Sequence, residues 1–571
     1  MTRVERTAPV DTTETTAGAG PAGAPAVPGP PATPGPGWLA VALLAVNLPI
    51  VVATVRALAR GWQPLGDNGL MLVRARDVGT AHHPLLGLWS SASLLFDKDL
   101  NHPGPLYFDV LALPVRLLGP WVGLAVGVML INMAAATLAV VVARRVGGVR
   151  ALVAVAAAVV GLQWAMGSEL LFDVWQPNAL VLPMMALLVV AVALAGGDPA
   201  MAPWFVGVGS LLAQTHVSYL PLVAALAAGT AVLAGLSVRR SPERVAWRAP
   251  LALAVVVGVL AWVQPVVEQV TSDGEGNLSR LARAAVADGQ DAIGAGRALR
   301  IMAEVLTGPW YARGSYESAV PITAPDAPIQ GLLAPSAALV VLSLTVVVLA
   351  GLVLAGRRTG CRPLATMAAV AVAALVTGLV TLASSPVNIT GVAVHGMRWL
   401  WPIAALVTAT VLYGVLVLLR PGPGVARVGA PALVLSLALA VAAGNLATYH
   451  SRSWGPVLTA PELPAAQELA AGLDAIEGRG TVLVDVAGVR YGEPYTGLLL
   501  AEMQDRGIPF VLDNEGMIRQ VGEGRRYDGH AELRLWHAEG EAAGRRPPGA
   551  ELLASSDEGP LAVALFVEPI G

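Results

Sequence analysis

The chain has 571 residues, of which 55% are hydrophobic and only 13% are charged, and its formal net charge is −3. Soluble globular chains carry about 25% charged residues, so this composition excludes a soluble cytosolic enzyme and a disordered scaffold. The single cysteine, Cys361, can form no intramolecular disulfide, and the chain has no basic surplus with which to bind nucleic acid. Together with a mean hydropathy of +0.65, the composition predicts an all-α polytopic membrane protein.

Residues 1–37 are rich in Ala, Gly, Pro and Thr and contain too little apolar bulk to fold. They are predicted to form a disordered cytoplasmic segment. The stretch 18–23 formally matches a dinucleotide-binding fingerprint, but no strand precedes it, so the match is rejected. The first apolar run, 38–58, is too long for a cleaved signal peptide and is interpreted as a signal anchor.

Apolar runs long enough to cross a membrane recur along the chain. A bilayer core of about 30 Å requires about 20 helical residues. After the signal anchor, such runs lie near 120–142, 150–166, 178–197, 200–216, 219–238, 249–268, 333–355, 363–384, 398–419 and 430–447. The sequence therefore predicts about eleven transmembrane helices within a membrane domain over residues 38–447.

Arginine residues gather in alternate loops, which orients the helices because cytoplasmic loops collect positive charge. With the N-terminus inside, the interior loops hold Arg144, Arg145, Arg150, Arg239, Arg240, Arg244, Arg248, Arg357, Arg358, Arg362, Arg420 and Arg427. The loops near 167–177, 217–218 and 385–397 contain no Arg or Lys. The pattern predicts a cytoplasmic N-terminus and an extracytoplasmic C-terminus. A composition rich in Ala, Arg and Gly, with Lys98 as the only lysine, indicates the plasma membrane of a high-GC bacterium.

Three segments are expected outside the membrane, on the extracytoplasmic side. The first external loop covers 59–119 and the fourth covers 269–332. Within the first, the stretch 104–118 is short and interrupted by proline and arginine, so it is predicted to lie along the membrane surface.

Residues 448–571 regain ordinary charge and are predicted to form a small α/β domain. Helices are expected near 464–477 and 495–506, and strands near 481–486, 510–512, 532–536 and 561–567.

Polar and ionisable residues outside the arginine-rich loops are the informative ones in a chain of so little charge. They concentrate in the external loops, where the candidate residues are Asp67, Arg74, Asp77, Lys98, His102, Tyr107, Asp173, Trp175, His216, His395 and Arg398. A carboxylate at such a boundary can take a proton from a hydroxyl, and Arg with His can hold a phosphate. This combination favours displacement at a sugar carbon whose leaving group is a lipid phosphate.

These motifs, in their order, resemble the GT-C membrane glycosyltransferases, in particular the branch of protein O-mannosyltransferases and bacterial aminoarabinose transferases. An aspartate, Asp67, follows the first span, and the stretch 102–107 (His-Pro-Gly-Pro-Leu-Tyr) opens a surface helix. A second external aspartate, Asp173, precedes the fourth span, and Arg398 begins an Arg-aromatic-x-x-Pro element. Two departures are Asn68, where the family often has an acidic residue, and the inserted Gly104.

The resemblance and the residue chemistry together imply an inverting transfer from a polyprenyl-phosphate sugar to a cell-envelope glycan, lipid or protein. Asp67 is the expected base, with Asp173 beside it and Asp77 as the fallback. Arg398, His216, Lys98 and Arg74 are expected at the donor phosphate, and His102, Tyr107, His395 and Trp175 at the sugar or acceptor. No cofactor is expected, and the sequence leaves the metal requirement open.

Simpler interpretations stand beside several of these assignments. Asp67 could cap a helix, Asp173 could only bond its own loop, and Arg74 with Asp77 could lie on a solvated helix face. Arg398 could reach lipid headgroups, and His216 could be an ordinary interfacial histidine. Trp399 and Trp401 are expected in an interfacial aromatic belt rather than at a sugar.

Three other functions also fit parts of the pattern. A membrane sensor whose domain over residues 448–571 binds a ligand would need a cytoplasmic output module, and no interior loop is long enough to be one. A polymerase or ligase of surface polysaccharide shares the chemistry, although here the acids lie in the first external loop. A transporter or flippase would need charged residues or broken helices near mid-membrane, and these spans are almost uninterrupted Ala, Val and Leu.

Overall fold

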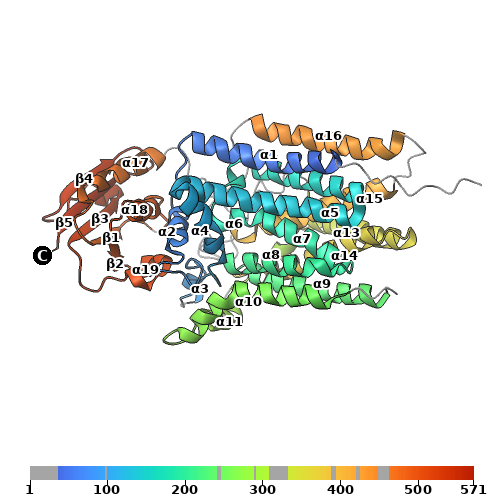
Figure 1. Cartoon of the computed structure of the whole chain (residues 1–571), viewed down its shortest axis with the longest axis horizontal. Helices are drawn as coiled ribbons and strands as arrows, with labels where there is room; N and C mark the ends of the chain where they lie inside the picture. The colour runs from blue at the N-terminus through green and yellow to red at the C-terminus, as the bar shows by residue number, and fades with distance from the viewer. Residues whose placement is uncertain are drawn as a thin grey trace, which may run out of the picture.

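The computed structural model describes residues 37–96, 99–240, 246–287, 291–307, 332–387, 394–418, 425–447, 462–490 and 492–570. The expected disordered segment, except Gly37, and the predicted phosphate-binding Lys98 lie outside these residues. The described residues form a bundle of long helices with a small mixed sheet at one end (Figure 1). The predicted fold class, an all-α polytopic membrane protein with a small C-terminal α/β domain, is confirmed.

Within the described part of the chain, nine helices are long and apolar enough to cross a membrane. They are α1 (Gly37–Ala59), α5 (Pro120–Met166), α6 with α7 (Gln176–Ala179 and Val181–Ala195), α9 (Tyr219–Arg240), α10 (Arg248–Thr271), α13 (Pro335–Arg358), α14 (Arg362–Ser384), α15 (Leu400–Leu418) and α16 (Val425–Ala447).

The difference from eleven expected spans has two sources. Helix α5 spans 47 residues, and its backbone leaves the helical conformation at Gly147 and Gly148, so it contains two of the predicted runs. Gly148 has a φ of 65°, which favours glycine. The run near 200–216 forms α8 (Ala202–Thr215), whose 14 residues are fewer than a span of about 20 requires.

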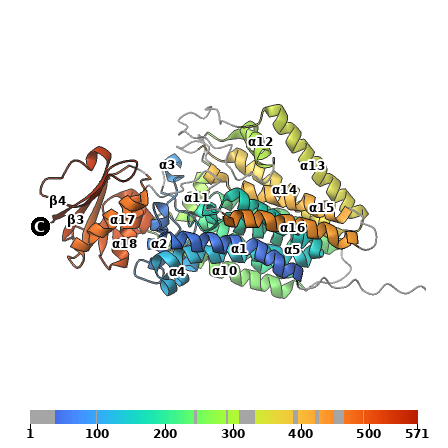
Figure 2. The same ribbon diagram turned by 90° about the horizontal axis from the view of Figure 1, so that it is seen from above.

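Helix α7 lies at the centre of the bundle, because 94% of its span is buried against its neighbours. The spans of α10 and α13 are only 11% and 17% buried, and Val259 and Leu260 on α10 are more than 60% exposed. Figure 2 shows α13 at the outer edge of the bundle. Side chains this apolar on an outer face suit contact with lipid tails. The central helix α7 follows directly on the external loop that carries Asp173.

The arginine-rich loops meet at one end of the bundle. Arg145, in one of these loops, forms an ion pair with Asp198 of the connection between α7 and α8, and the Cys361 thiol lies 3.7 Å from the Tyr413 hydroxyl. The sheet and the first external loop lie at the opposite end (Figure 1). The arginine-rich loops and the first external loop therefore lie at opposite ends of the bundle.

The segment predicted to be the first external loop, residues 59–119, forms the layer between the bundle and the sheet and keeps that name below. It contains α2 (Asp67–Asp77), α3 (Ser93–Phe96) and α4 (Leu106–Leu118). Helix α4 crosses α5 closely, since a Cβ on Gly123 or Gly127 would overlap α4 atoms. It leaves Leu113 and Leu117 64% and 72% exposed, as a helix on a membrane surface would. The described part of the fourth external loop forms α11 (Asn277–Ala285) and α12 (Gly294–Val305).

The C-terminal domain is a five-stranded sheet in the order β2-β1-β3-β5-β4. Its elements are α17 (Glu462–Gly472), β1 (Val482–Gly488), α18 (Tyr495–Asp505), β2 (Phe510–Leu512), α19 (Glu515–Val521), β3 (Leu533–Glu539), β4 (Glu551–Ser556) and β5 (Val563–Pro569). Strands β2, β1 and β3 are parallel, whereas β3, β5 and β4 are antiparallel. The sequence missed α19, which is only seven residues long, and β4, an edge strand with little alternation of burial.

Candidate active site where three external loops meet

Asp67 is the first residue of α2, and its side chain turns to another loop. The N-cap of α2 is Gly66, and no side chain caps the helix, so the capping interpretation of Asp67 does not hold. The carboxylate instead accepts a 3.0 Å hydrogen bond from the indole Nε1 of Trp175, 108 residues along the chain. Asp67 keeps access to solvent. The second external loop thus reaches the first through this contact.

Asp173, in the second external loop, also contacts the first external loop; the region where the external loops meet is called the junction below. Its carboxylate accepts hydrogen bonds from the side-chain amides of Asn68 at 2.9 Å and Asn178 at 2.5 Å. It also accepts a 3.2 Å bond from the backbone N–H of Trp175. Asp67 and Asp173 are therefore joined twice, once through Asn68 beside Asp67 and once through Trp175. The interpretation that Asp173 only bonds its own loop is too narrow.

Both carboxyl groups have raised pKa values. Desolvation by the surrounding protein raises the pKa of Asp67, the charge of Asp173 adds to the rise, and the hydrogen bond from Trp175 opposes it. Burial likewise raises the pKa of Asp173, against its three hydrogen bonds and the charge of Arg398. A raised pKa makes a carboxylate a stronger base, and Asp67 is the member of the pair with solvent access.

Arg398 lies just before α15 and is fully buried. Its guanidinium carbon lies 5.9 Å from the ring centroid of Trp175 and 5.1 Å from that of Trp401. Such burial excludes the interpretation that Arg398 reaches out to lipid headgroups. The aromatic-belt prediction is also wrong, because Trp399 and Trp401 are 1% and 0% exposed. These indoles pack inside the bundle, where one of them supports the guanidinium.

Three histidines surround the same region. The rings of His102 and His216 lie 4.7 Å apart, and the ring of His395 lies 5.1 Å from that of Trp175. Burial lowers the pKa of His102 to about 4. Burial, together with the charge of Arg398, lowers the pKa of His395 to about 4. Burial also lowers the pKa of His216 well below its usual range, and His102 and His395 add to this effect. All three imidazoles are therefore neutral at neutral pH.

The tautomers of two histidines follow from backbone contacts. Nδ1 of His102 accepts the N–H of Val217 at 3.2 Å, and Nδ1 of His216 accepts the N–H of Ser218 at 3.3 Å. Because a backbone N–H can only donate, each neutral ring carries its proton on Nε2. Each ring can thus donate one hydrogen bond from Nε2 to an oxygen atom.

Tyr107 lies on α4 and is buried. Its hydroxyl donates a 2.8 Å hydrogen bond to the carbonyl of Val174, between Asp173 and Trp175. The structure thus gives Tyr107 a role in holding the second external loop, and its predicted contact with a sugar stays a prediction.

The sequence prediction is wrong for Asp77 and Arg74. Asp77 lies at the far end of α2 and is 1% exposed, and both of its carboxylate oxygens accept hydrogen bonds from Arg525 of the C-terminal domain. Arg74 is paired with the same carboxylate at 2.9 Å. The interpretation as a solvated helix face is also wrong, because the C-terminal domain covers these residues. Asp77 has no access to an acceptor and cannot serve as the fallback base.

Sequence reasoning assigned no role to three residues of the site. Asn68 and Asn178 both hold Asp173, and Tyr219 lies against His216 with ring centroids 6.3 Å apart. Proximity in the chain was the available signal, since Asn68 adjoins Asp67 and Tyr219 follows the loop of His216. Among the described residues, no group of three or more His, Cys, Asp and Glu side chains is placed to hold a metal ion.

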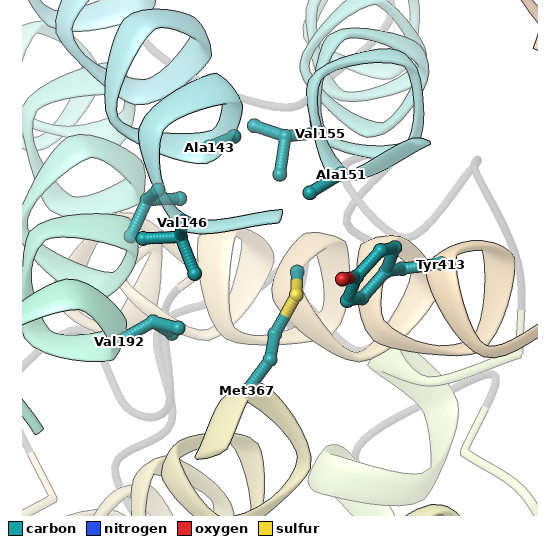
Figure 3. Close-up of a pocket in the computed structure, with 8 residues that line it drawn as sticks. Ala143, Val146, Ala151, Val155, Val192, Met367 and Tyr413 are labelled. Atoms are coloured by element: carbon teal, nitrogen blue, oxygen red, sulfur yellow. The ribbon is translucent and has the colours of Figure 1, made fainter. Parts of the chain in front are cut away.

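An apolar pocket lies at the arginine-rich end of the bundle (Figure 3). Its lining includes Val146, Val155, Val192 and Met367, and Tyr413 brings the only hydroxyl group among the lining residues. This pocket contains no acid, imidazole or guanidinium, so it does not compete with the junction of the external loops as a candidate for polar chemistry.

The junction combines three chemical capacities. The solvent-accessible carboxylate of Asp67 can take a proton. The guanidinium of Arg398 can bind an anion through a planar set of N–H groups. The neutral imidazoles of His102 and His216 can each donate one hydrogen bond to an oxygen atom. Away from bulk water, such charge-assisted bonds are stronger than in solution.

Comparison with known proteins supports the fold. The chain resembles the crystal structure of ArnT from Cupriavidus metallidurans bound to undecaprenyl phosphate, with a TM-score of 0.53 at 12% sequence identity. The match covers 92% of this chain and 97% of that one. Neither a family model nor a curated protein sequence matches the chain. The expectation of a GT-C fold is confirmed, and at this identity the likeness establishes the fold alone.

Proposed function

We propose that this protein is a membrane glycosyltransferase that moves a sugar from a polyprenyl-phosphate donor to a hydroxyl of a cell-envelope acceptor. The observation that carries the proposal is the position of Trp175, which bonds Asp67 and lies beside Arg398. A group able to take a proton and a group able to bind a phosphate thus contact one side chain. The reaction requires both groups within the span of one sugar phosphate.

In the proposed reaction, Asp67 takes the proton of the acceptor hydroxyl. The acceptor oxygen then forms a bond to the anomeric carbon while the bond from that carbon to the phosphate oxygen breaks. The polyprenyl phosphate leaves with the electron pair of the broken bond, and the configuration of the sugar inverts. Arg398 and the Nε2–H groups of His102 and His216 stabilise the charge that develops on the phosphate.

We place this site on the extracytoplasmic face. The end of the bundle opposite the site carries the arginine-rich loops, including Arg145 and Arg358, and such loops face the cytoplasm. A donor dissolved in the membrane suits that face, because nucleotide sugars are confined to the cytoplasm. The undecaprenyl phosphate bound in the ArnT structure belongs to the same class of lipid as the proposed donor.

The test is transfer by purified protein from radiolabelled polyprenyl-phosphate sugars to envelope acceptors. Asp67→Asn is expected to bind undecaprenyl phosphate with wild-type affinity and to lose transfer by about a hundredfold or more, the range that a positioned base contributes. Asp198→Asn is the matched control, because this acid lies at the opposite end of the bundle in an exposed ion pair.

Three outcomes would contradict the proposal. Normal turnover by Asp67→Asn would remove Asp67 from the role of base. Movement of intact donor lipid across proteoliposome membranes, without a glycosylated product, would identify a flippase instead. A product lengthened by a preassembled chain rather than by one sugar would identify a polysaccharide ligase.

A further inference from the structure

Helix α2 touches the C-terminal domain at its first turn without intervening side chains. Gly69 of α2 and Gly497 of α18 lie at this contact: a Cβ on Gly69 would overlap the backbone of α18, and a Cβ on Gly497 would overlap the carbonyl oxygen of Gly66, the N-cap of α2. Next to this contact, the N–H of Gly66 donates a 2.7 Å hydrogen bond to the carbonyl of Pro494. The residue after Gly66 is Asp67, so the C-terminal domain bonds the chain immediately before the proposed base.

The last turn of α2 is held by a buried ion cluster. Arg525 donates two hydrogen bonds to Asp77, at 2.7 and 2.6 Å, and the two side chains are 5% and 1% exposed. Gln504 of α18 donates a third bond to Asp77 at 2.8 Å. Arg74, on α2 itself, donates a fourth at 2.9 Å. All four bonds end on one carboxylate.

The cluster is complete only when the C-terminal domain is docked. Two guanidinium groups share one carboxylate, so the second positive charge needs other acceptors. The carbonyl oxygen of Val521 is such an acceptor: it accepts a hydrogen bond from Arg74 at 2.5 Å and another from Arg525 at 3.0 Å. The Arg525 guanidinium also lies 4.8 Å from the ring centroid of Phe510. Separation would remove the three hydrogen bonds that Arg525 and Gln504 donate to Asp77 and would leave only its pair with Arg74 on α2.

Contacts with the C-terminal domain at both ends of helix α2 fix its position. Helix α2 has 11 residues, so its two ends are about 15 Å apart. Figure 1 shows it between the C-terminal domain and the bundle. Rotation or sliding of α2 would break either the glycine contact or the ion cluster. It would also move Asp67 away from Trp175.

We propose that the C-terminal domain is a brace that holds α2 so that Asp67 stays against Trp175, and that Gly497 and Arg525 are positioning residues of that brace. The inference rests on the proposed role of Asp67 as the base. It assigns the domain a mechanical role in transfer, with no contact of its own to the donor lipid.

The first test is Gly497→Ala in the full-length protein. The added Cβ pushes α18 away from Gly66, so α2 is expected to exchange its amide hydrogens about tenfold faster over residues 66–77. We expect kcat to fall about 10- to 100-fold, since misplacement of about 1 Å has that effect, while KM for the donor and affinity for undecaprenyl phosphate stay within about twofold. Gly544→Ala is the matched control, because Gly544 is exposed and has only an ordinary contact nearby.

The second test guards against misfolding of the first variant. Arg525→Gln keeps a hydrogen-bond donor beside Asp77 and leaves the Arg74–Asp77 pair intact, so the domain should stay folded. Arg525→Lys keeps the charge but loses the bidentate hydrogen bonding to the Asp77 carboxylate. We expect faster exchange in α2 and lower kcat in both variants, with the lysine variant closer to wild type.

The outcomes separate the brace from the proposed function. If wild-type protein transfers no sugar, the function fails, whereas exchange in α2 still reports on the brace. Wild-type kcat in Gly497→Ala and Arg525→Gln, whether or not α2 exchanges faster, would overturn the brace. A loss that appears in donor affinity instead of kcat would also overturn it, because it would place the domain at the lipid.

Discussion

The indole Nε1 of Trp175 donates a 3.0 Å hydrogen bond to Asp67, and the same ring lies 5.9 Å from the guanidinium carbon of Arg398. One half-buried side chain thereby joins the first, second and fifth external loops. His395 packs on this ring as well. The proposed base and the proposed phosphate-binding residue consequently share a mechanical support, and a change in Trp175 should affect both of them measurably.

Trp175→Phe is expected to move the acid limb of the pH profile of kcat/KM to higher pH. The indole hydrogen bond lowers the pKa of Asp67, against a larger rise from desolvation. Without it, the carboxyl binds its proton more tightly and the active, ionised fraction is lost at a higher pH. Because Asp67 has solvent access, we expect a shift of about half to one pH unit. An unchanged limb would contradict the assignment of Asp67.

Asp173→Asn is expected to shift the acid limb of the pH profile in the opposite direction. The charge of Asp173 raises the pKa of Asp67, so its removal is expected to move the same limb to lower pH. The variant also leaves three donors facing an amide with one acceptor oxygen. Stability should therefore fall by about 1–3 kcal/mol, measured by thermal unfolding in detergent. Shifts of the same sign in Asp173→Asn and Trp175→Phe would exclude Asp67 as the titrating group.

Arg398→Lys is expected to weaken binding of undecaprenyl phosphate by about tenfold or more, the effect of losing one charge-assisted hydrogen bond. Lysine keeps the charge but cannot stack between Trp175 and Trp401 or present a planar pair of donors. Binding is measured directly with the purified protein. Arg357→Lys is the control, because Arg357 is exposed in the last turn of α13, at the arginine-rich end of the bundle. Equal affinities in both variants would end the phosphate assignment.

Acidification is expected to destabilise the protein through its buried histidines. Burial lowers the pKa of His102 to about 4, below the unfolded value of about 6.5. Between these values the unfolded chain binds more protons, so stability falls as pH drops from about 6.5 towards about 4. His102→Gln, whose side-chain oxygen can still accept the N–H of Val217, should remove about 1–2 kcal/mol of this dependence. His530→Gln, at an exposed position, is the control.

The proposed orientation can be measured by cysteine labelling. In a Cys361→Ser background, Asp557→Cys adds a thiol to an exposed position of the C-terminal domain, and Thr359→Cys adds one to an exposed position between α13 and α14. A membrane-impermeant maleimide added to intact cells should label only the Asp557→Cys protein. Labelling of only the Thr359→Cys protein would reverse the topology and remove the argument for an extracytoplasmic site.

Much of the architecture follows from local sequence. Hydrophobic length predicts the long helices, because each span must satisfy its backbone hydrogen bonds within itself and bury apolar side chains in protein or lipid. Strands β1 and β5 of the C-terminal domain are predictable for a similar reason, because each begins with five consecutive buried residues that are mostly apolar. The short α19 and the exposed edge strand β4 carry no such signal and were missed.

The sequence predicted the candidate site only in part. Chain order and residue chemistry pointed to Asp67, Asp173, His216 and Arg398, and the structure brings their loops together. Sequence spacing also suggested Asp77, since helical periodicity cannot say which face of α2 another domain will cover. The sequence did not predict that Trp401 is buried against Arg398. A tryptophan at the end of a span is equally compatible with an interfacial aromatic belt and with a protein core.

The sequence by itself determined which segments enter the membrane and which residue types gather at one face, since hydropathy and charge act on each segment separately. Only the tertiary structure decided that Trp175 bonds Asp67 across 108 residues and that Arg525 claims Asp77 across 448. Contacts over such separations depend on how whole helices and domains pack. No periodicity within one segment encodes that choice, because the energy that favours it arises when the segments meet.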